Sequence, residues 1–83
     1  MIRISKLTDY ALVIMAFLSK EPAIFAQTSD IAQHTSISKP TTAKVLKKLA
    51  NHGLLESHRG TAGGYKLSKK PDKISVADII QII

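Results

Sequence analysis

The strongest pattern in the chain lies at residues 36–53, where hydrophobic and polar side chains recur with the period of a helix. One face of this predicted helix is apolar and consists of Thr42, Val45, Leu46 and Leu49. The opposite face is mainly cationic and consists of Pro40, Lys44, Lys47, Lys48 and Asn51. Both ends carry suitable residues, because Ser38 can cap the first turn, Pro40 fits within it, and Gly53 suits a left-handed end.

A shorter segment, residues 29–35, precedes this helix and predicts a second one. Its Ile31 and Ala32 are spaced to pack on the apolar face of the longer helix, and a turn at residues 35–37 joins the two. Two helices joined by so short a turn predict a helix-turn-helix. In that motif the second helix places its N-terminal residues in the DNA major groove.

The N-terminal stretch predicts a further helix, from about Ser5 to Leu18 or Ser19 and ending before Pro22. One of its faces is apolar and consists of Leu7, Tyr10, Ala11, Ile14, Phe17 and Leu18. A second apolar face consists of Leu12, Val13, Met15 and Ala16. A helix that is apolar on both sides is buried on both. The second cover is expected to be another subunit, a segment outside this chain, or residues 74–83.

Residues 21–27 connect the first helix to the helix-turn-helix. Within them residues 23–25 are expected to form a short extended piece, and Thr28 or Ser29 is expected to cap the helix that follows. The apolar run before this connector is too short to span a bilayer, and Asp9 and Tyr10 interrupt the approach to it. An export signal and a membrane partner are therefore not expected.

After Gly53 the periodicity changes to the looser alternation of strands, at residues 54–59 and 65–67. Three glycines within residues 60–64 predict a tight hairpin tip between them. Two strands and a tip after a helix-turn-helix form a wing. Arg59 is expected at the base of this wing, and Lys66 on the returning strand.

The last residues combine a helix-capping pattern with apolar spacing. Ser75 and Asp78 match the S-x-x-D/E capping box, and isoleucines and a valine surround them. The chain stops inside this helix without a C-cap, so residues 74–83 are expected to be the start of a truncated connecting helix. The predicted fold class is therefore mainly α with a small β-hairpin, a single winged helix-turn-helix domain over residues 1–83.

Charge is unevenly placed along these 83 residues, whose net charge is +6. Residues 38–73 hold nine cationic side chains and two carboxylates, whereas residues 1–37 are balanced. Such clustering favours a polyanion as partner, although a merely solvated, lysine-rich surface remains the alternative. The chain has no cysteine, which excludes disulfides and cysteine-ligated metals within it. No paired carboxylates or activated nucleophile point to an enzyme.

Several short motifs together resemble one family. Residues 4–11, I-S-K-L-T-D-Y-A, are similar to an S-K-x-x-x-Y-A signature, and residues 59–67 form R-G-x-x-G-G-Y-x-L. Further similarity lies in D-I-A at 30–32, I-S at 37–38, L-x-x-x-G-L at 49–54 and I-S-V-A-D-I-I at 74–80. Across essentially the whole chain these motifs resemble the Rrf-type transcription regulators, bacterial winged-helix proteins that include IscR and NsrR. Residues 2–11 are most similar to the regulators of Suf iron–sulfur assembly genes.

The resemblance implies a cytoplasmic regulator of iron–sulfur assembly or redox-stress genes, in the manner of a repressor. It also implies a missing C-terminal part in which three cysteines bind an iron–sulfur cluster and a long helix makes the homodimer. No cofactor is expected within this chain, because the cluster ligands have no counterpart among these residues.

Double-stranded DNA is the expected partner, with the helix at 38–52 in the major groove and the wing at 59–65 in the minor groove. Lysines are expected at phosphates, and Lys39, Pro40, Thr41, Ala43 and Lys44 at base edges. The resemblance implies that Arg59 enters the minor groove, where a guanidinium suits a narrow A·T-rich site; an ion pair with Glu56 is the alternative. The predicted DNA-binding set is Thr28, Ser29, Ser38, Lys39, Pro40, Thr41, Ala43, Lys44, Lys47, Lys48, Arg59, Gly60, Thr61 and Gly63.

A winged-helix adaptor that binds proteins rather than DNA is the alternative function. Such modules often lose the cationic helix face and the wing arginine, and both are present here. The three histidines, His34, His52 and His58, lack metal-ligand spacing and are expected to be exposed polar residues.

Overall fold

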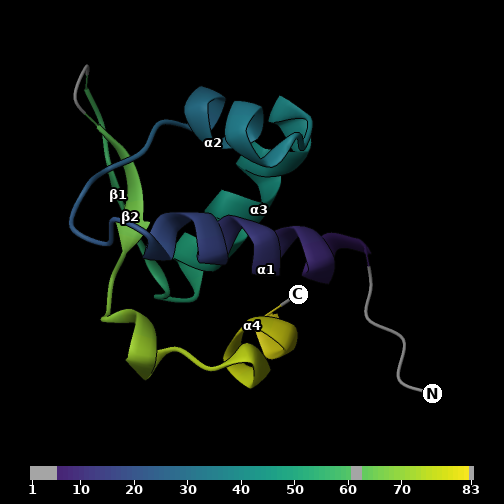
Figure 1. The fold of residues 1–83 in the computed structure, drawn as a ribbon, viewed down its shortest axis with the longest axis vertical. Helices are drawn as coiled ribbons and strands as arrows, with labels where there is room; N and C mark the ends of the chain where they lie inside the picture. The colour runs from purple at the N-terminus through teal and green to yellow at the C-terminus, as the bar shows by residue number, and fades with distance from the viewer. Residues whose placement is uncertain (1–5, 61–62, 83) are drawn as a thin grey trace.

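The computed structural model describes residues 6–60 and 63–82. Four helices and one antiparallel hairpin make the domain, in the order α1 (Lys6–Ser19), α2 (Thr28–Thr35), α3 (Lys39–Asn51), β1 (Leu55–His58), β2 (Gly64–Leu67) and α4 (Val76–Ile82). A short 3-10 turn, η1 (Pro71–Lys73), lies between β2 and α4. Figure 1 shows α1 crossing the middle of the molecule, with α2 above it, α4 below it and the hairpin at one end. The predicted fold class is confirmed.

The start of α3 is fixed by its cap, as predicted. Ser38 occupies the N-cap position, and its hydroxyl oxygen accepts from the backbone N–H of Thr41 at 3.4 Å. Pro40 lies in the first turn, where its missing N–H leaves no bond unmade. At the other end Gly53 has a φ of +83°, and its N–H donates to the Ala50 carbonyl. These end signals are local, which is why the predicted bounds of this helix, residues 38–52, agree closely with those of α3.

The turn between α2 and α3 depends on a left-handed serine. Ser36 has φ 59° and ψ 29°, and its N–H donates to the Ala32 carbonyl. Few non-glycine residues adopt this conformation. The predicted cap of α2 is wrong: Gln27 holds the N-cap position, and Thr28 is already the first helical residue. The reason is that the chain remains extended through Gln27 and turns directly into the helix from there.

The core forms where α1, α2 and α3 meet. Ile14 of α1, Ile31 of α2 and Leu46 and Leu49 of α3 are completely buried. The first predicted face of α1 is confirmed, since Ala11, Ile14 and Leu18 are buried and Leu7, Tyr10 and Phe17 pack partly against the core. These contacts hold α3 with one face in the core and the other in solvent.

The second apolar face of α1 is partly covered by α4. This helix belongs to residues 74–83, which were one of the three covers predicted from the sequence. Met15 of α1 and Ile79 of α4 are both 5% exposed. A groove of about 210 Å³ remains between them, and Val13, Val76 and Ile80 stay exposed.

The capping box of α4 is confirmed: the Ser75 N–H donates to Asp78 Oδ2 at 3.0 Å, and the Asp78 N–H donates to Ser75 Oγ at 3.1 Å. The hydrogen bond from the Ser75 N–H holds the pKa of Asp78 below its ordinary value of 3.8.

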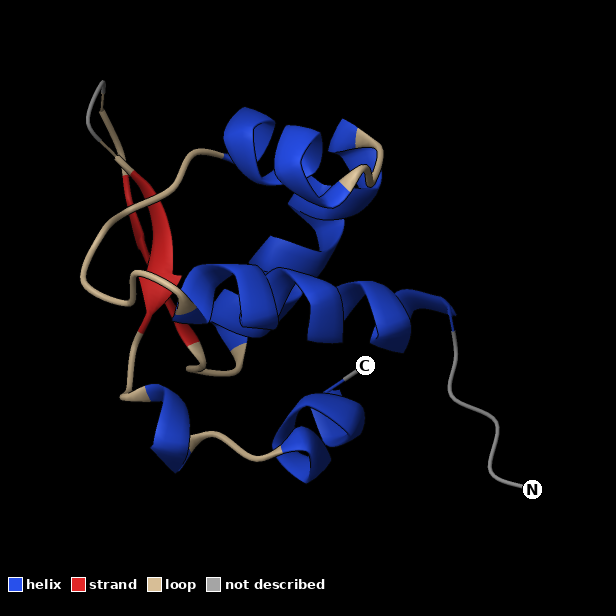
Figure 2. Ribbon diagram, viewed as in Figure 1, coloured by secondary structure: helices blue, strands red, loops and turns tan. Residues whose placement is uncertain are grey.

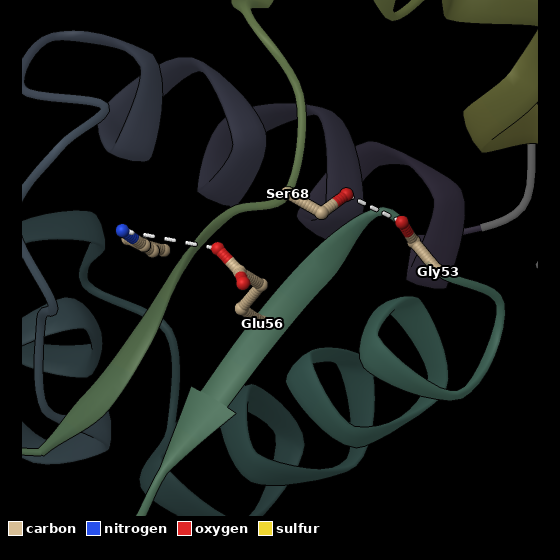
Figure 3. A network of polar contacts seen from close by, with 4 residues as sticks. Gly53, Glu56 and Ser68 are labelled. Atoms are coloured by element: carbon tan, nitrogen blue, oxygen red, sulfur yellow. Dashed lines mark hydrogen bonds and ion pairs between the residues drawn. The ribbon is translucent and has the colours of Figure 1, made fainter.

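The wing is the hairpin of β1 and β2, whose register runs from Leu55 opposite Leu67 to His58 opposite Gly64. Its base is tied to the end of α3, because the Ser68 hydroxyl donates to the Gly53 carbonyl and the Ser68 N–H donates to the Leu54 carbonyl at 3.0 Å (Figure 3). Arg59 was predicted at the base of the wing, and this is wrong. It follows β1 directly, so it lies at the tip end of the hairpin.

The connector between α1 and α2 runs along the wing (Figure 2). Residues 23–25 were predicted to be extended, whereas the structure has turns at 22–23 and places the extended pairing at Ala26. The Ala26 N–H donates to the Tyr65 carbonyl and the Tyr65 N–H donates to the Ala26 carbonyl, each at 2.8 Å. This pairing joins residues far apart in the sequence, so no local sequence pattern could predict it.

Candidate nucleic-acid interface

The solvent face of α3 carries most of the predicted base-contacting residues. Lys39, Pro40, Ala43 and Lys44 are exposed, and Thr41 is half-buried beside the Ser38 cap. Lys47 is exposed and Lys48 half-buried one turn further on. The helix therefore presents a cationic face with small side chains near its N-terminus, where an approaching duplex meets little steric obstruction.

An open cleft of about 480 Å³ lies between α3, the wing and the start of α2. It brings together five members of the predicted set: Thr28, Lys47, Arg59, Gly60 and Gly63. The other described members lie outside the cleft lining, namely Ser29, Ser38, Lys39, Pro40, Thr41, Ala43, Lys44 and Lys48. Thr61 lies outside the described residues. The cleft thus separates the helix face from the wing and is bordered by a cation on each side.

Arg59 is exposed at the tip end of the wing. Its alternative role, an ion pair with Glu56, is not found among the described residues; Glu56 instead lies 3.8 Å from Lys66 Nζ (Figure 3). Lys66 Nζ also lies 4.9 Å from the centre of the Phe25 ring. Lys66 is thereby occupied by neighbours within the domain, while Arg59 extends from the strand end beside the cleft.

The glycines shape the tip of the wing. Gly63 is buried, and a Cβ there would lie 2.2 Å from the His58 carbonyl oxygen. The Gly63 N–H donates to the Gly60 carbonyl at 3.1 Å. Within the predicted set, Gly63 therefore closes the turn after Arg59, and Gly60 leaves the surface beside Arg59 without a side chain.

The sequence prediction missed seven residues that line the cleft: Gln27, Ala50, Asn51, Ser57, His58, Gly64 and Tyr65. Asn51 was already placed on the cationic face of the helix, and that signal was sufficient to include it. Ser57 lies between Glu56 and His58 on β1. The alternation of a strand could therefore have placed its side chain on the other face of the hairpin from theirs. Gln27 reaches the cleft only through the pairing of Ala26 with Tyr65, for which the sequence held no local signal.

The histidines are exposed, as expected, but two of them contact aromatic rings: His34 is stacked on Phe17, and His58 is tilted against Phe25. His34 lies 5.3 Å from Phe17 and His58 lies 5.5 Å from Phe25, measured between ring centres. Within residues 6–60 and 63–82, no group of three or more His, Cys, Asp or Glu side chains is placed to hold a metal ion. Iron–sulfur clusters are held chiefly by cysteine thiolates, and the chain has none. These residues therefore do not fit such a cluster.

A family model described as an iron-dependent transcriptional regulator, Rrf2, matches residues 4–83. The chain belongs to the Rrf2 family. The match extends from the start of the described part of α1 to the end of α4, so it includes every element that borders the cleft. The resemblance to the Rrf-type regulators inferred from the motifs is confirmed.

Two curated relatives and one solved structure show the similarity within the Rrf2 family. A putative HTH-type transcriptional regulator of Aquifex aeolicus is 37% identical over 73 residues, which cover 88% of this chain and 51% of the relative. NsrR of Bacillus subtilis is 32% identical over 80 residues, 95% of this chain and 55% of the relative. The structure of CymR, the global cysteine regulator of B. subtilis, superposes with a TM-score of 0.93 at 36% identity, over 99% of this chain and 64% of that one.

The chain spans about half the length of the curated Rrf2 relatives it matches. Across residues 6–60 and 63–82 no helix is both long and apolar enough to cross a membrane.

Proposed function

We propose that this chain is the DNA-reading domain of a bacterial transcription regulator, with α3 in the major groove and the wing at residues 59–65 in the minor groove. One observation carries the proposal: Lys47 and Asn51, from the solvent-facing side of α3, and Arg59 of the wing line the same open cleft. A helix and a hairpin that flank a cleft can enter neighbouring grooves of one duplex. The Rrf2 family supports the same assignment.

Base contacts fall to the first turns of α3. Lys39 and Lys44 can donate to guanine O6 and N7, and the Ala43 and Thr41 methyl groups suit the methyl of thymine. Lys47, Lys48 and the start of α2 at Thr28 and Ser29 face the phosphates, which supply affinity that is independent of sequence and weakens with salt.

The wing supplies the second contact. Arg59 is exposed beside glycines that carry no side chain, so its guanidinium can enter a narrow groove without obstruction. A·T-rich minor grooves are narrow and strongly negative, and G·C pairs add an N2 amino group there. Arg59 is therefore proposed to favour A·T pairs at the edge of the site.

The genes under control are proposed to be those of iron–sulfur assembly or the redox-stress response, on the basis of the resemblance of residues 2–11 to the Suf regulators. Any cluster of the whole protein is proposed to lie outside these 83 residues, since the chain has no cysteine. A homodimer is proposed to place two such domains on the half-sites of a palindromic operator, and the protein is proposed to act in the cytoplasm without enzymatic activity.

The test is fluorescence anisotropy of the chain on palindromic duplexes with A·T flanks and on random duplex, at two salt concentrations. Sequence preference that survives the higher salt is the expected result. Arg59→Ala should weaken binding to the A·T-flanked duplex by about tenfold, in line with the loss of one charged groove contact. Lys20→Ala is the matched control, because Lys20 is an exposed cation at the end of α1, away from the cleft. Absence of binding at either salt concentration would favour the adaptor function instead.

A further inference from the structure

One face of the wing carries a cluster of side chains that have no assigned DNA contact, although one of them, His58, also lines the cleft. The strand register places Glu56 opposite Lys66 and His58 opposite Gly64 on this face. The Phe25 ring, which comes from the connector, lies 5.5 Å from the His58 ring and 4.9 Å from Lys66 Nζ. Figure 3 shows the Glu56 carboxylate directed across to the neighbouring strand, where its partner is Lys66. One aromatic ring thus joins the connector to both strands of the wing.

The backbone reinforces this junction. The two 2.8 Å hydrogen bonds between Ala26 and Tyr65 form an isolated antiparallel β-bridge between the connector and β2. Gly64 allows the close approach, since a Cβ at that position would lie 2.2 Å from the Ala26 carbonyl oxygen. Gly64 also leaves the face between Phe25 and His58 without a side chain, and the ring from the connector lies close to His58 there.

The same junction borders the proposed DNA-binding cleft. On one side Phe25 and Ala26 lead directly to Gln27 and Thr28, where α2 begins at the edge of the cleft. On the other side His58 leads directly to Arg59, which lines the opposite edge. Because the connector is bonded to the wing, the start of α2 and the position of Arg59 are set relative to one another.

We propose that Phe25 is a positioning residue for Arg59: through its contact with His58 it fixes the wing on the connector, and so sets where the guanidinium enters the minor groove. The inference rests on the proposed function, because it assigns Phe25 a part in the wing contact of Arg59. A contact between the half-buried Phe25 and the exposed His58 lies outside the buried core and adds little to the global fold, whereas a hairpin of two strands is marginal without such support.

The experiment measures flank preference, defined as the Kd on a G·C-flanked duplex divided by the Kd on an A·T-flanked duplex. A third duplex carries inosine·C flanks, which lack the guanine N2 amino group, and wild type should bind it like the A·T duplex. Phe25→Ala should lower the flank preference about fivefold, the size of one aromatic contact, while the dependence on salt stays unchanged. Phe25→Tyr keeps the ring and should retain the preference.

A double-mutant cycle separates positioning from general destabilisation. In an Arg59→Ala background, Phe25→Ala should have no further effect on flank preference, because Phe25 acts through Arg59. Ile24→Ala is the matched control, since Ile24 is the exposed connector residue next to Phe25. In the free protein, Phe25→Ala should shift the ring-proton NMR signals of His58 and speed amide exchange at Ala26 and Tyr65.

The outcomes distinguish the two proposals. An unchanged flank preference in Arg59→Ala would overturn the minor-groove role of Arg59 and the inference with it. A loss in Arg59→Ala but not in Phe25→Ala would overturn the inference alone. An equal loss from Phe25→Ala in both backgrounds would show that Phe25 acts on the whole fold, and this also overturns it. Should Phe25→Ala melt the domain, Phe25→Leu keeps the apolar volume without the ring and answers the same question.

Discussion

Ser38 and Ser29 show how much the position of a single hydroxyl matters at a helix start. Both are exposed serines near an N-terminus, and both were predicted to contact DNA or cap a helix. Ser38 caps α3, whereas Ser29 is the second residue of α2 and Gln27 holds its cap position. The two positions therefore make a matched pair in which only one hydroxyl supports the fold.

Ser38→Ala should lower the free energy of unfolding by about 1 kcal/mol, because it removes the acceptor for the Thr41 N–H. Ser29→Ala should change it by no more than about 0.5 kcal/mol, as an exposed substitution inside a helix. Urea unfolding followed by circular dichroism measures both. Equal losses in the two variants would contradict the assignment of the caps.

At the scale of elements, the start of α4 is held by a titratable group, the carboxylate of Asp78. This helix has seven residues and one buried side chain, Ile79, and its start is held by the reciprocal bonds of Ser75 and Asp78. The carboxylate of Asp78 accepts the Ser75 N–H, so the folded state favours the charged form and the pKa of Asp78 is lowered. The capping box is therefore tied to pH.

Because the pKa of Asp78 is lower in the folded chain, its contribution to stability is present above its ordinary value of 3.8 and is lost as the pH falls below that value. The first turn of α4 should loosen in this acidic range before α1 and α3 unfold. Amide NMR signals of Val76 and Ala77, followed between pH 6 and pH 2.5, measure this. Asp78→Asn should abolish that early step, and an early step that persists in the variant would assign it to another group.

The same scale explains how far the sequence could predict the structure. The ends of α3, the capping box of α4 and the hairpin were predictable because each depends on residues within a few positions of one another. The pairing of Ala26 with Tyr65 and the ring contacts of Phe25 cross almost half the chain, and nothing near Ala26 indicates them. Arg59 was identified as a wing residue, but its place at the tip end depended on the register of the strands. Among the residues that line the cleft, the cations Lys47 and Arg59 were predictable, whereas the contribution of Gln27 from the connector was not.

At the scale of the whole molecule, the cationic side chains and the hydrophobic core lie on opposite faces of α3. The nine cationic side chains of residues 38–73 include those on the exposed face of α3, while its other face supplies Val45, Leu46 and Leu49 to the core. A single helix thus joins the stability of the domain to its proposed contact with DNA. Substitutions on its two faces should separate the two properties.

Lys47→Gln should lower the slope of log K against log salt by about 0.9, since Lys47 is proposed to neutralise one phosphate, whereas Lys44→Gln should change the slope less, because Lys44 is proposed to donate to the uncharged edge of guanine. Their melting temperatures should match wild type, because both side chains are exposed. Lys20→Gln should leave the slope unchanged. A common slope for all three variants would refute a localised DNA contact.

Leu46→Ala should instead destabilise the domain by about 2–5 kcal/mol, because Leu46 is completely buried between the helices. So large a loss would unfold much of an 83-residue domain at room temperature. Calorimetry and circular dichroism measure it, with Ile80→Ala, an exposed side chain on α4, as the control. Near-wild-type melting in Leu46→Ala would contradict the placement of this residue.

Two glycines of the domain differ in how freely their positions can vary over generations. Gly53 needs only a left-handed backbone, with nothing within 4 Å of an added Cβ, so asparagine is an accessible replacement. At Gly64 a side chain would collide with the Ala26 carbonyl, so this position can change only if the connector moves as well. The connector leads into α2, and α2 into the recognition helix. Lineages that reshape the wing must therefore reshape the entrance to the helix-turn-helix in the same step, and the two parts of the DNA-binding surface diverge together.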